Sequence, residues 1–303
     1  MSFYVYGKNI SGACNLWDPT PVSSQHHLKP IVDMKKLSLL LFCLLFALAG
    51  LAQKREQRNV KDFTKVSFGV PGTCEVTQGN TFKVELEGDP DILEKIETRV
   101  EGNRLIIGTG DRWNNWRWNS NDRIRAFVTL PVVDGLSVGG SGSLIVKNKI
   151  NADDLDLRVS GSGSLEATTD VKGRLGADVS GSGELNINGT AGSVDSDVSG
   201  SGKARVACTI RDRASFGISG SGKIEAEGTA REVRADISGS GKILAAGLVT
   251  DECEVRISGS GDVEIHVNKE LDATISGSGS VSYKGNPQHV NSNASGSGSV
   301  RKM

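Results

Sequence analysis

Apolar and polar residues alternate along most of the second half of the chain, which is the pattern of β-strands with one buried face. Pairs such as Leu185/Ile187 and Val263/Ile265 follow this period of two. Between the alternating stretches a glycine-rich tetrapeptide recurs at intervals of about 18–21 residues, as Gly-Gly-Ser-Gly in its first copy and as Ser-Gly-Ser-Gly afterwards. The copies start at Gly139, Ser160, Ser180, Ser199, Ser219, Ser238, Ser258, Ser276 and Ser295.

The repeat predicts a stack of coils. An apolar or small residue precedes every tetrapeptide, from Val138 to Ala294. One unit of this length cannot bury its own apolar face, whereas stacked units share a continuous core. We therefore predict an all-β fold: a right-handed parallel β-helix (β-solenoid) with coils of about 19–20 residues and a Ser-Gly-Ser-Gly corner in each. The right hand is expected because connections between parallel strands are almost always right-handed. The glycines are expected to face inward, and the serines outward in ladders whose hydroxyls bond from coil to coil.

The segment before the repeats has a different character. Strand patterns cover Phe63–Phe68, Phe82–Leu86 and Ile124–Leu130, and Asp89-Pro90 is typical of the start of a short helix. We expect residues 53–138 to start and cap the solenoid that residues 139–303 continue, because an open β end invites aggregation.

An export signal is predicted inside the N-terminal region. Met34-Lys35-Lys36 precedes an apolar run that ends at Ala49, and Gly50-Leu51-Ala52 provides small residues for cleavage before Gln53. Residues 34–52 are therefore interpreted as a signal peptide and residues 1–33 as a wrongly assigned N-terminal extension. The alternative is a signal anchor, but the apolar run is short for a membrane span. The predicted location is beyond the inner membrane: periplasm, cell surface or extracellular, with no transmembrane segment in the mature chain.

Composition narrows the classes of function. The chain has 35 Lys+Arg against 36 Asp+Glu, a balance that does not fit a nucleic-acid-binding protein. Aromatic residues make up 5%, so an enzyme core built on large rings is not expected in the repeats. The mature chain has Cys74, Cys208 and Cys253, an odd number that allows at most one internal disulfide. Neither the cysteine nor the histidine spacing indicates a metal site or a cofactor.

The order of these features resembles the secreted bacterial family called putative auto-transporter adhesin, head GIN domain. The resemblance covers about residues 58–303 and implies a right-handed β-helix with an adhesin-like role; no catalytic residues come with it. The matching segments are Val60–Phe63, Gly102–Ile107, Val128–Pro131, Gly140–Gly142, the Ser-Gly-Ser-Gly coils and Tyr283–Pro287.

Two groups of residues are candidate binding sites. Trp113, Trp116 and Trp118 lie in one polar loop, where they form either a stacking platform for sugar rings or, as we favour, apolar cover for the end of the solenoid. The residues that follow the tetrapeptides form a column that contains Lys203, Lys223 and Lys242. Stacked lysines can bind an anionic glycan or lipid headgroup, although a solvated charged face is the more common use of such residues.

Stacked aspartates raise the question of catalysis. Asp178, Asp197 and Asp236 stand two residues before their tetrapeptides, and paired carboxylates cleave glycosides. Gly217 interrupts the column and no residue that would tune the pKa values recurs beside it, so we expect no catalytic site. The favoured function is a secreted, non-catalytic adhesin-like protein that binds a glycan or another cell-envelope polymer. A polysaccharide-active enzyme and a structural envelope spacer that forms homo-oligomers through its last coil are the alternatives.

Overall fold

A computed structural model describes residues 54–110, 118 and 123–303. These residues belong to one compact unit, Gln53–Met303, and are mainly β-strand. The predicted leader and the extension before it lie outside the described residues. The one helix with defined bounds in the described part, α2 (Pro90–Leu93), has four residues, so no helix there has the length to cross a membrane.

Each coil consists of two strands joined by a tetrapeptide corner. In each coil one strand leads into the corner, and these strands form one face of the solenoid, which we call face 1. They are β2 (Lys65–Phe68), β8 (Gly135–Gly140), β11 (Leu155–Gly161), β13 (Arg174–Gly181), β15 (Ser193–Gly200), β17 (Arg213–Gly220) and β22 (His289–Gly296). The strands that leave the corner form face 2: β3 (Gly72–Gln78), β9 (Ser143–Val146), β12 (Ser164–Val171), β14 (Glu184–Ala191), β16 (Lys203–Ile210), β21 (Ser280–Lys284) and β23 (Ser299–Lys302).

Three long strands bend from one face to the other. These are β18 (Lys223–Gly239), β19 (Lys242–Gly259) and β20 (Asp262–Gly277). Their first halves lie in face 2 and their second halves in face 1. A short strand, β10 (Ile150–Ala152), pairs with the end of β12.

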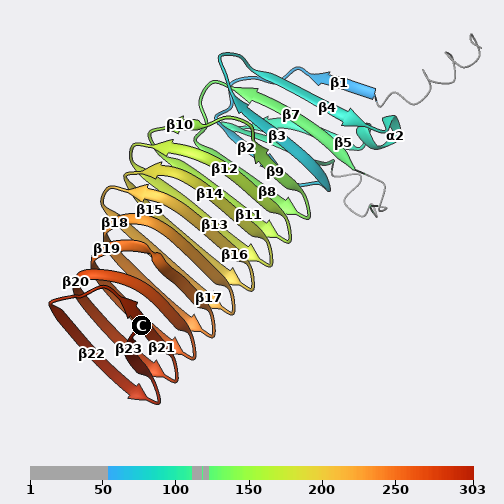
Figure 1. Cartoon of the computed structure of the whole chain (residues 1–303). Helices are drawn as coiled ribbons and strands as arrows, with labels where there is room; N and C mark the ends of the chain where they lie inside the picture. Colours follow the sequence, from blue (N-terminus) through green and yellow to red (C-terminus); the bar gives the residue numbers. More distant parts are fainter. Residues whose placement is uncertain (1–53, 111–117, 119–122) are drawn as a thin grey trace, which may run out of the picture. The chain divides into compact units, whose positions relative to one another are not determined.

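The coils stack in parallel, one above the next (Figure 1). In this register Val138 pairs with Val159, Val159 with Val179, and Val179 with Val198, and the column continues to Ala294. These are the residues that precede the tetrapeptides. The predicted solenoid is therefore confirmed, and the period of the repeat is one coil.

Antiparallel strands finish the stack at its N-terminal end. Face 2 continues from β3 to β7 (Ile124–Leu130), then antiparallel to β4 (Lys83–Gly88) and β1 (Lys54–Arg58). Face 1 continues from β2 to β6 (Arg104–Thr109) and antiparallel β5 (Ile96–Glu101). The helix α2 lies between β4 and β5 and begins as predicted, with the Asp89 carboxylate accepting a hydrogen bond of 2.9 Å from the Asp91 amide.

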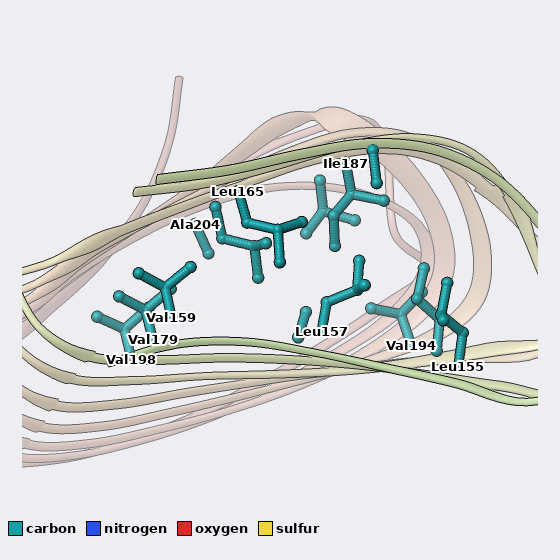
Figure 2. Close-up of a cluster of buried hydrophobic side chains, with 14 of the residues drawn as sticks. Leu155, Leu157, Val159, Leu165, Val179, Ile187, Val194, Val198 and Ala204 are labelled. Carbon is teal, nitrogen blue, oxygen red and sulfur yellow. The ribbon is translucent and has the colours of Figure 1, made fainter. Parts of the chain in front are cut away.

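The core fills the space between the two faces. Leu155, Leu157 and Val159 of β11 point inward from face 1 toward Leu165 of β12 on face 2, and equivalent residues repeat in the next coils (Figure 2). All four are at most 1% exposed. A shared core of this kind explains why single coils of about twenty residues are stable only in a stack.

The corners require glycine because successive coils approach closely there. Gly181 has φ of +102°, and a Cβ on it would lie 2.6 Å from the Gly161 carbonyl oxygen of the coil before. A Cβ on Gly183 would lie 2.4 Å from Cγ1 of Val159, so the second glycine faces the core. The corners are joined by backbone hydrogen bonds, such as Ser182 N–H to Gly161 O at 2.8 Å. In the part of the chain the structure describes, the hydrogen bonds between successive corners link backbone groups and no two tetrapeptide hydroxyls bond to each other, so the predicted serine ladder is wrong.

Candidate functional site

The three predicted lysines lie in one column on face 2. Lys203 pairs in register with Lys223, and Lys223 with Lys242. Each has an acidic partner: Lys203 Nζ lies 2.8 Å from Glu225, Lys223 Nζ 3.9 Å from the same carboxylate, and Lys242 Nζ 2.9 Å from Asp262. The hydrogen bond from Lys203 is the main cause of a lowered pKa at Glu225. The column exists, but acidic neighbours balance its charge.

The tryptophan prediction is only partly within the described structure. Trp118 is half-buried and packs against the hydrophobic core. Trp113 and Trp116 lie outside the described residues, so a stacking platform stays a prediction.

A shallow hollow on face 1 lies beside the tetrapeptide corners. Its volume is about 540 Å³, and we call it the corner groove. It extends over several consecutive coils, and Val198, Ile218, Ile237 and Ile257, the residues that precede the corners, form the apolar part of its lining. The outward-facing residues that line it are Asp197, Ser199, Gly217, Ser219, Asp236, Ser238, Arg256, Ser258, Thr274 and Ser276.

The absence of a side chain at Gly217 shapes the groove. Asp197, Gly217 and Asp236 occupy the same position in successive coils, so the aspartate column is interrupted there. The Asp197 carboxylate leans into the free space: a Cβ on Gly217 would lie 2.1 Å from its Oδ1 atom. The groove is therefore hollow at Gly217 and polar on both sides of it.

The two aspartates of the groove have different electrostatic surroundings. Asp197 has no ion pair in the described part of the chain, and its pKa is raised by desolvation and by repulsion from Asp178 and Asp195. Asp236 lies 2.7 Å from the Arg234 guanidinium. The groove thus places one uncompensated carboxylate beside one that is neutralised.

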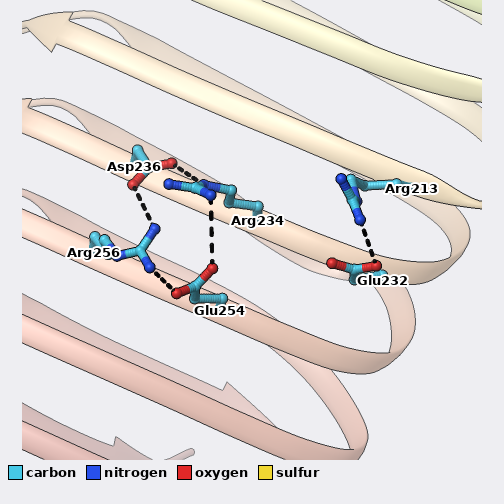
Figure 3. A network of polar contacts seen from close by, with 6 residues as sticks. All are labelled: Arg213, Glu232, Arg234, Asp236, Glu254 and Arg256. Atoms are coloured by element: carbon cyan, nitrogen blue, oxygen red, sulfur yellow. Dashed lines mark hydrogen bonds and ion pairs between the residues drawn. The ribbon is translucent and has the colours of Figure 1, made fainter.

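An ion-pair network lies along the groove and shares Asp236 and Arg256 with its lining. Arg234 and Arg256 each contact both Asp236 and Glu254 across neighbouring coils (Figure 3). The pair Arg213–Glu232, 3.1 Å apart, lies on the same face. Sequence reasoning missed this network, although aligning the coils on their tetrapeptides would have placed Asp236 opposite Arg256 and Arg234 opposite Glu254.

The cysteines have no visible chemical role. Cys74, Cys208 and Cys253 are unpaired and buried. Burial raises the pKa of each thiol, to about 11 for Cys208, so reactive thiolates are not favoured. Within the described ranges, no group of three or more His, Cys, Asp or Glu residues is arranged to hold a metal ion.

These observations define a class: a parallel β-solenoid with a polar, hydroxyl-lined outer surface. The chain belongs to the family described as putative auto-transporter adhesin, head GIN domain, whose model matches residues 62–211 and 206–287. No curated protein sequence matches the chain.

Solved structures share the fold. A protein from Parabacteroides distasonis named a putative lipid binding protein is 24% identical, with a TM-score of 0.65 over 84% of this chain and 97% of its own. A putative adhesin from the same organism is 20% identical, with a TM-score of 0.59 over 82% and 96%. A putative adhesin from Parabacteroides merdae is 17% identical, with a TM-score of 0.51 over 84% and 97%. At these identities the likeness describes the fold alone.

Proposed function

We propose that the protein is an exported, non-catalytic adhesin-like module that binds a carbohydrate polymer of the cell envelope along the corner groove. Membership of a family described as adhesins supports the class of function. The leader predicted at residues 34–52 supports export to the periplasm, the cell surface or the medium.

The observation that carries the proposal is the run of hydroxyls in the groove. Ser199, Ser219, Ser238 and Ser258 repeat at one-coil intervals, about 4.8 Å apart. Each hydroxyl can both donate and accept a hydrogen bond, as sugar hydroxyls do. A shallow groove with a regular spacing suits a repeating polymer, whose many weak contacts add through avidity without a deep pocket.

An enzyme acting on polysaccharide is the second candidate. The raised pKa of Asp197 inside the groove favours it, because a glycosidase needs one carboxyl group that holds a proton. Against it, the nearest partner in the groove, Asp236, is held by Arg234, and the groove contains no histidine.

The proposal is tested by a polysaccharide array probed with the full chain. We expect binding to one class of polymer without release of reducing ends. Ser219→Trp places a large side chain in the middle of the groove and should abolish this binding. Thr168→Trp, at an exposed position of β12 on face 2, is the matched control and should bind as the unmodified protein does.

The outcomes separate the candidates. Reducing ends that appear with the unmodified protein and disappear with Asp197→Asn would establish the enzyme. An array without any binding, or binding that survives Ser219→Trp, would refute the groove as a polymer site.

A further inference from the structure

A second hollow lies at the N-terminal end of face 2, away from the corner groove. Its volume is about 450 Å³, within the range of small-ligand sites. Its lining joins the start of β3, the start of β7, the end of β4 and the first tetrapeptide corner. The lining residues are Pro71, Gly72, Thr73, Glu87, Arg123, Ile124, Arg125, Ser141 and Ser143.

Four of these residues form one row across neighbouring strands. Glu87 of β4 pairs in register with Arg125 of β7, Arg125 with Thr73 of β3, and Thr73 with Ser143 of β9. The residues next to them along their strands, such as Cys74 and Ile124, are buried in the core, so the row faces outward. Segments up to 70 residues apart in the chain thus place a carboxylate, a guanidinium and two hydroxyls side by side.

The two guanidinium groups of the hollow differ in their partners. Arg125 lies 3.2 Å from Glu75 and 3.7 Å from Glu87, so its charge is compensated. Arg123 is exposed and forms no ion pair with any residue that the structure describes. Counted over the described residues, the hollow therefore presents one positive charge, on Arg123, that has no counter-charge.

The hydroxyls beside this charge are able to donate hydrogen bonds. Ser143 accepts a hydrogen bond of 2.9 Å from the Ser164 hydroxyl, which leaves its own proton available. Ser141 and Thr73 line the same space. Glu87, whose charge is balanced by Arg125, adds an acceptor for a ligand hydroxyl.

We propose that this hollow binds a singly charged carboxylated sugar, a uronic acid residue of an envelope polysaccharide. The Arg123 guanidinium pairs with the sugar carboxylate in the planar geometry typical of arginine, and Thr73, Ser141, Ser143 and Glu87 bind the ring hydroxyls. The inference rests on the carbohydrate binding proposed above, adds a second site to it and names the sugar class.

The test is isothermal titration of the full chain with trigalacturonate, with maltotriose as the neutral probe. We expect trigalacturonate to bind, more weakly at high salt, and maltotriose not to bind at this site. Arg123→Gln should weaken trigalacturonate binding about tenfold or more, because a charged hydrogen bond is lost. Arg104→Gln changes another exposed arginine of the N-terminal strands and should leave the affinity unchanged.

Three results would overturn the inference: no binding of trigalacturonate, equal affinity of the Arg123→Gln variant, or equal binding of a sulfated trisaccharide. None of them bears on the corner groove, because the Ser219→Trp variant decides that site separately. Conversely, trigalacturonate binding that is lost with Arg123→Gln but kept with Ser219→Trp would support this site even if the groove binds nothing.

Discussion

Individual buried residues show how the coils adjust to one another. Phe216 is fully buried although most core positions hold smaller side chains. Its neighbours in the same column are Ser196 in the coil before and Ala235 in the coil after. The buried hydroxyl of Ser196 has a hydrogen-bond partner there, because it donates to the Ala177 carbonyl at 3.1 Å. A large ring is accommodated because the coils above and below it supply small residues.

Thr169 is a buried residue at which a substitution should stabilise the protein. It is fully buried, and its hydroxyl has no hydrogen-bond partner in the described structure. Thr169→Val keeps the shape and removes the unpaired hydroxyl, so the free energy of unfolding should rise by about 1 kcal/mol. Chemical denaturation of the variant and the unmodified protein measures this difference in the free energy of unfolding.

Thr250 is the matched control for that substitution. It is equally buried, but its hydroxyl lies 3.0 Å from the Arg231 carbonyl and 3.1 Å from the Glu252 carbonyl. Thr250→Val should therefore lower the free energy of unfolding by about 1 kcal/mol. Equal effects at the two positions would contradict the proposed role of the hydroxyl.

At the scale of the elements, the corner decides how closely two coils can approach. The first glycine adopts a positive φ and the second lies over the valine or isoleucine of a neighbouring coil, while backbone hydrogen bonds cross between them. The corner is thus a rigid joint between strands, in contrast to the flexible behaviour of serine- and glycine-rich linkers.

A methyl group at the second glycine of a corner should destabilise the stack. A Cβ on Gly202 would lie 2.5 Å from Cγ1 of Val179 and 2.8 Å from the Gly183 carbonyl oxygen. We expect Gly202→Ala to lower the free energy of unfolding by about 1–3 kcal/mol, as overpacking does. The melting temperature reports this change. Gly108→Ala serves as the comparison, because its nearest contact is at 3.9 Å and it should melt close to the unmodified protein.

The elements also show what the sequence was able to predict. The period of two and the regular tetrapeptides specify which side chains of each coil face inward, and the register agrees from Val138 to Ala294. The row Glu87–Arg125–Thr73–Ser143 could not be predicted, because β3, β4 and β7 contain no repeat and their pairing brings distant segments together. The corner groove could be predicted only in part. The sequence shows Gly217 as a gap in the aspartate column, but the shape of the hollow depends on how the Asp197 side chain leans into that gap.

At the scale of the whole solenoid, ion pairs link one coil to the next along its length. Examples are Arg158–Asp178, Arg174–Asp195 and Lys242–Asp262, at 3.1, 2.6 and 2.9 Å. Most of these groups are exposed, so each pair contributes little by itself. Together they place acidic side chains of one coil against basic side chains of the next along the solenoid.

The stability of the protein should depend on pH through these pairs, with opposite signs at two aspartates. Hydrogen bonds from Lys242 and Ser280 lower the pKa of Asp262, so its contribution is present above the unfolded value of 3.8 and is lost as the pH falls through the folded value. The pKa of Asp197 is raised, so its ionised form destabilises the fold at neutral pH.

Two asparagine variants test this difference. At pH 7, Asp262→Asn should lower the melting temperature and Asp197→Asn should raise it. The difference at Asp197 should shrink as the pH falls through its raised folded pKa toward 3.8, whereas the difference at Asp262 should shrink only as the pH falls below 3.8 toward its lowered folded pKa. Shifts of the same sign at pH 7 would contradict the assignment of Asp197 as the uncompensated carboxylate.

The repeating register has a consequence for how such a molecule changes its size. Every coil offers its neighbours the same inward column and the same corner carbonyls, as between Gly181 and Ser201 or between Gly200 and Ser221. Duplication or deletion of one complete turn therefore joins surfaces that already match. A gain or loss of half a turn would bring face 1 against face 2 and break the stack. Relatives of this protein can thus differ in length by whole turns while each keeps a continuous core and unbroken corners.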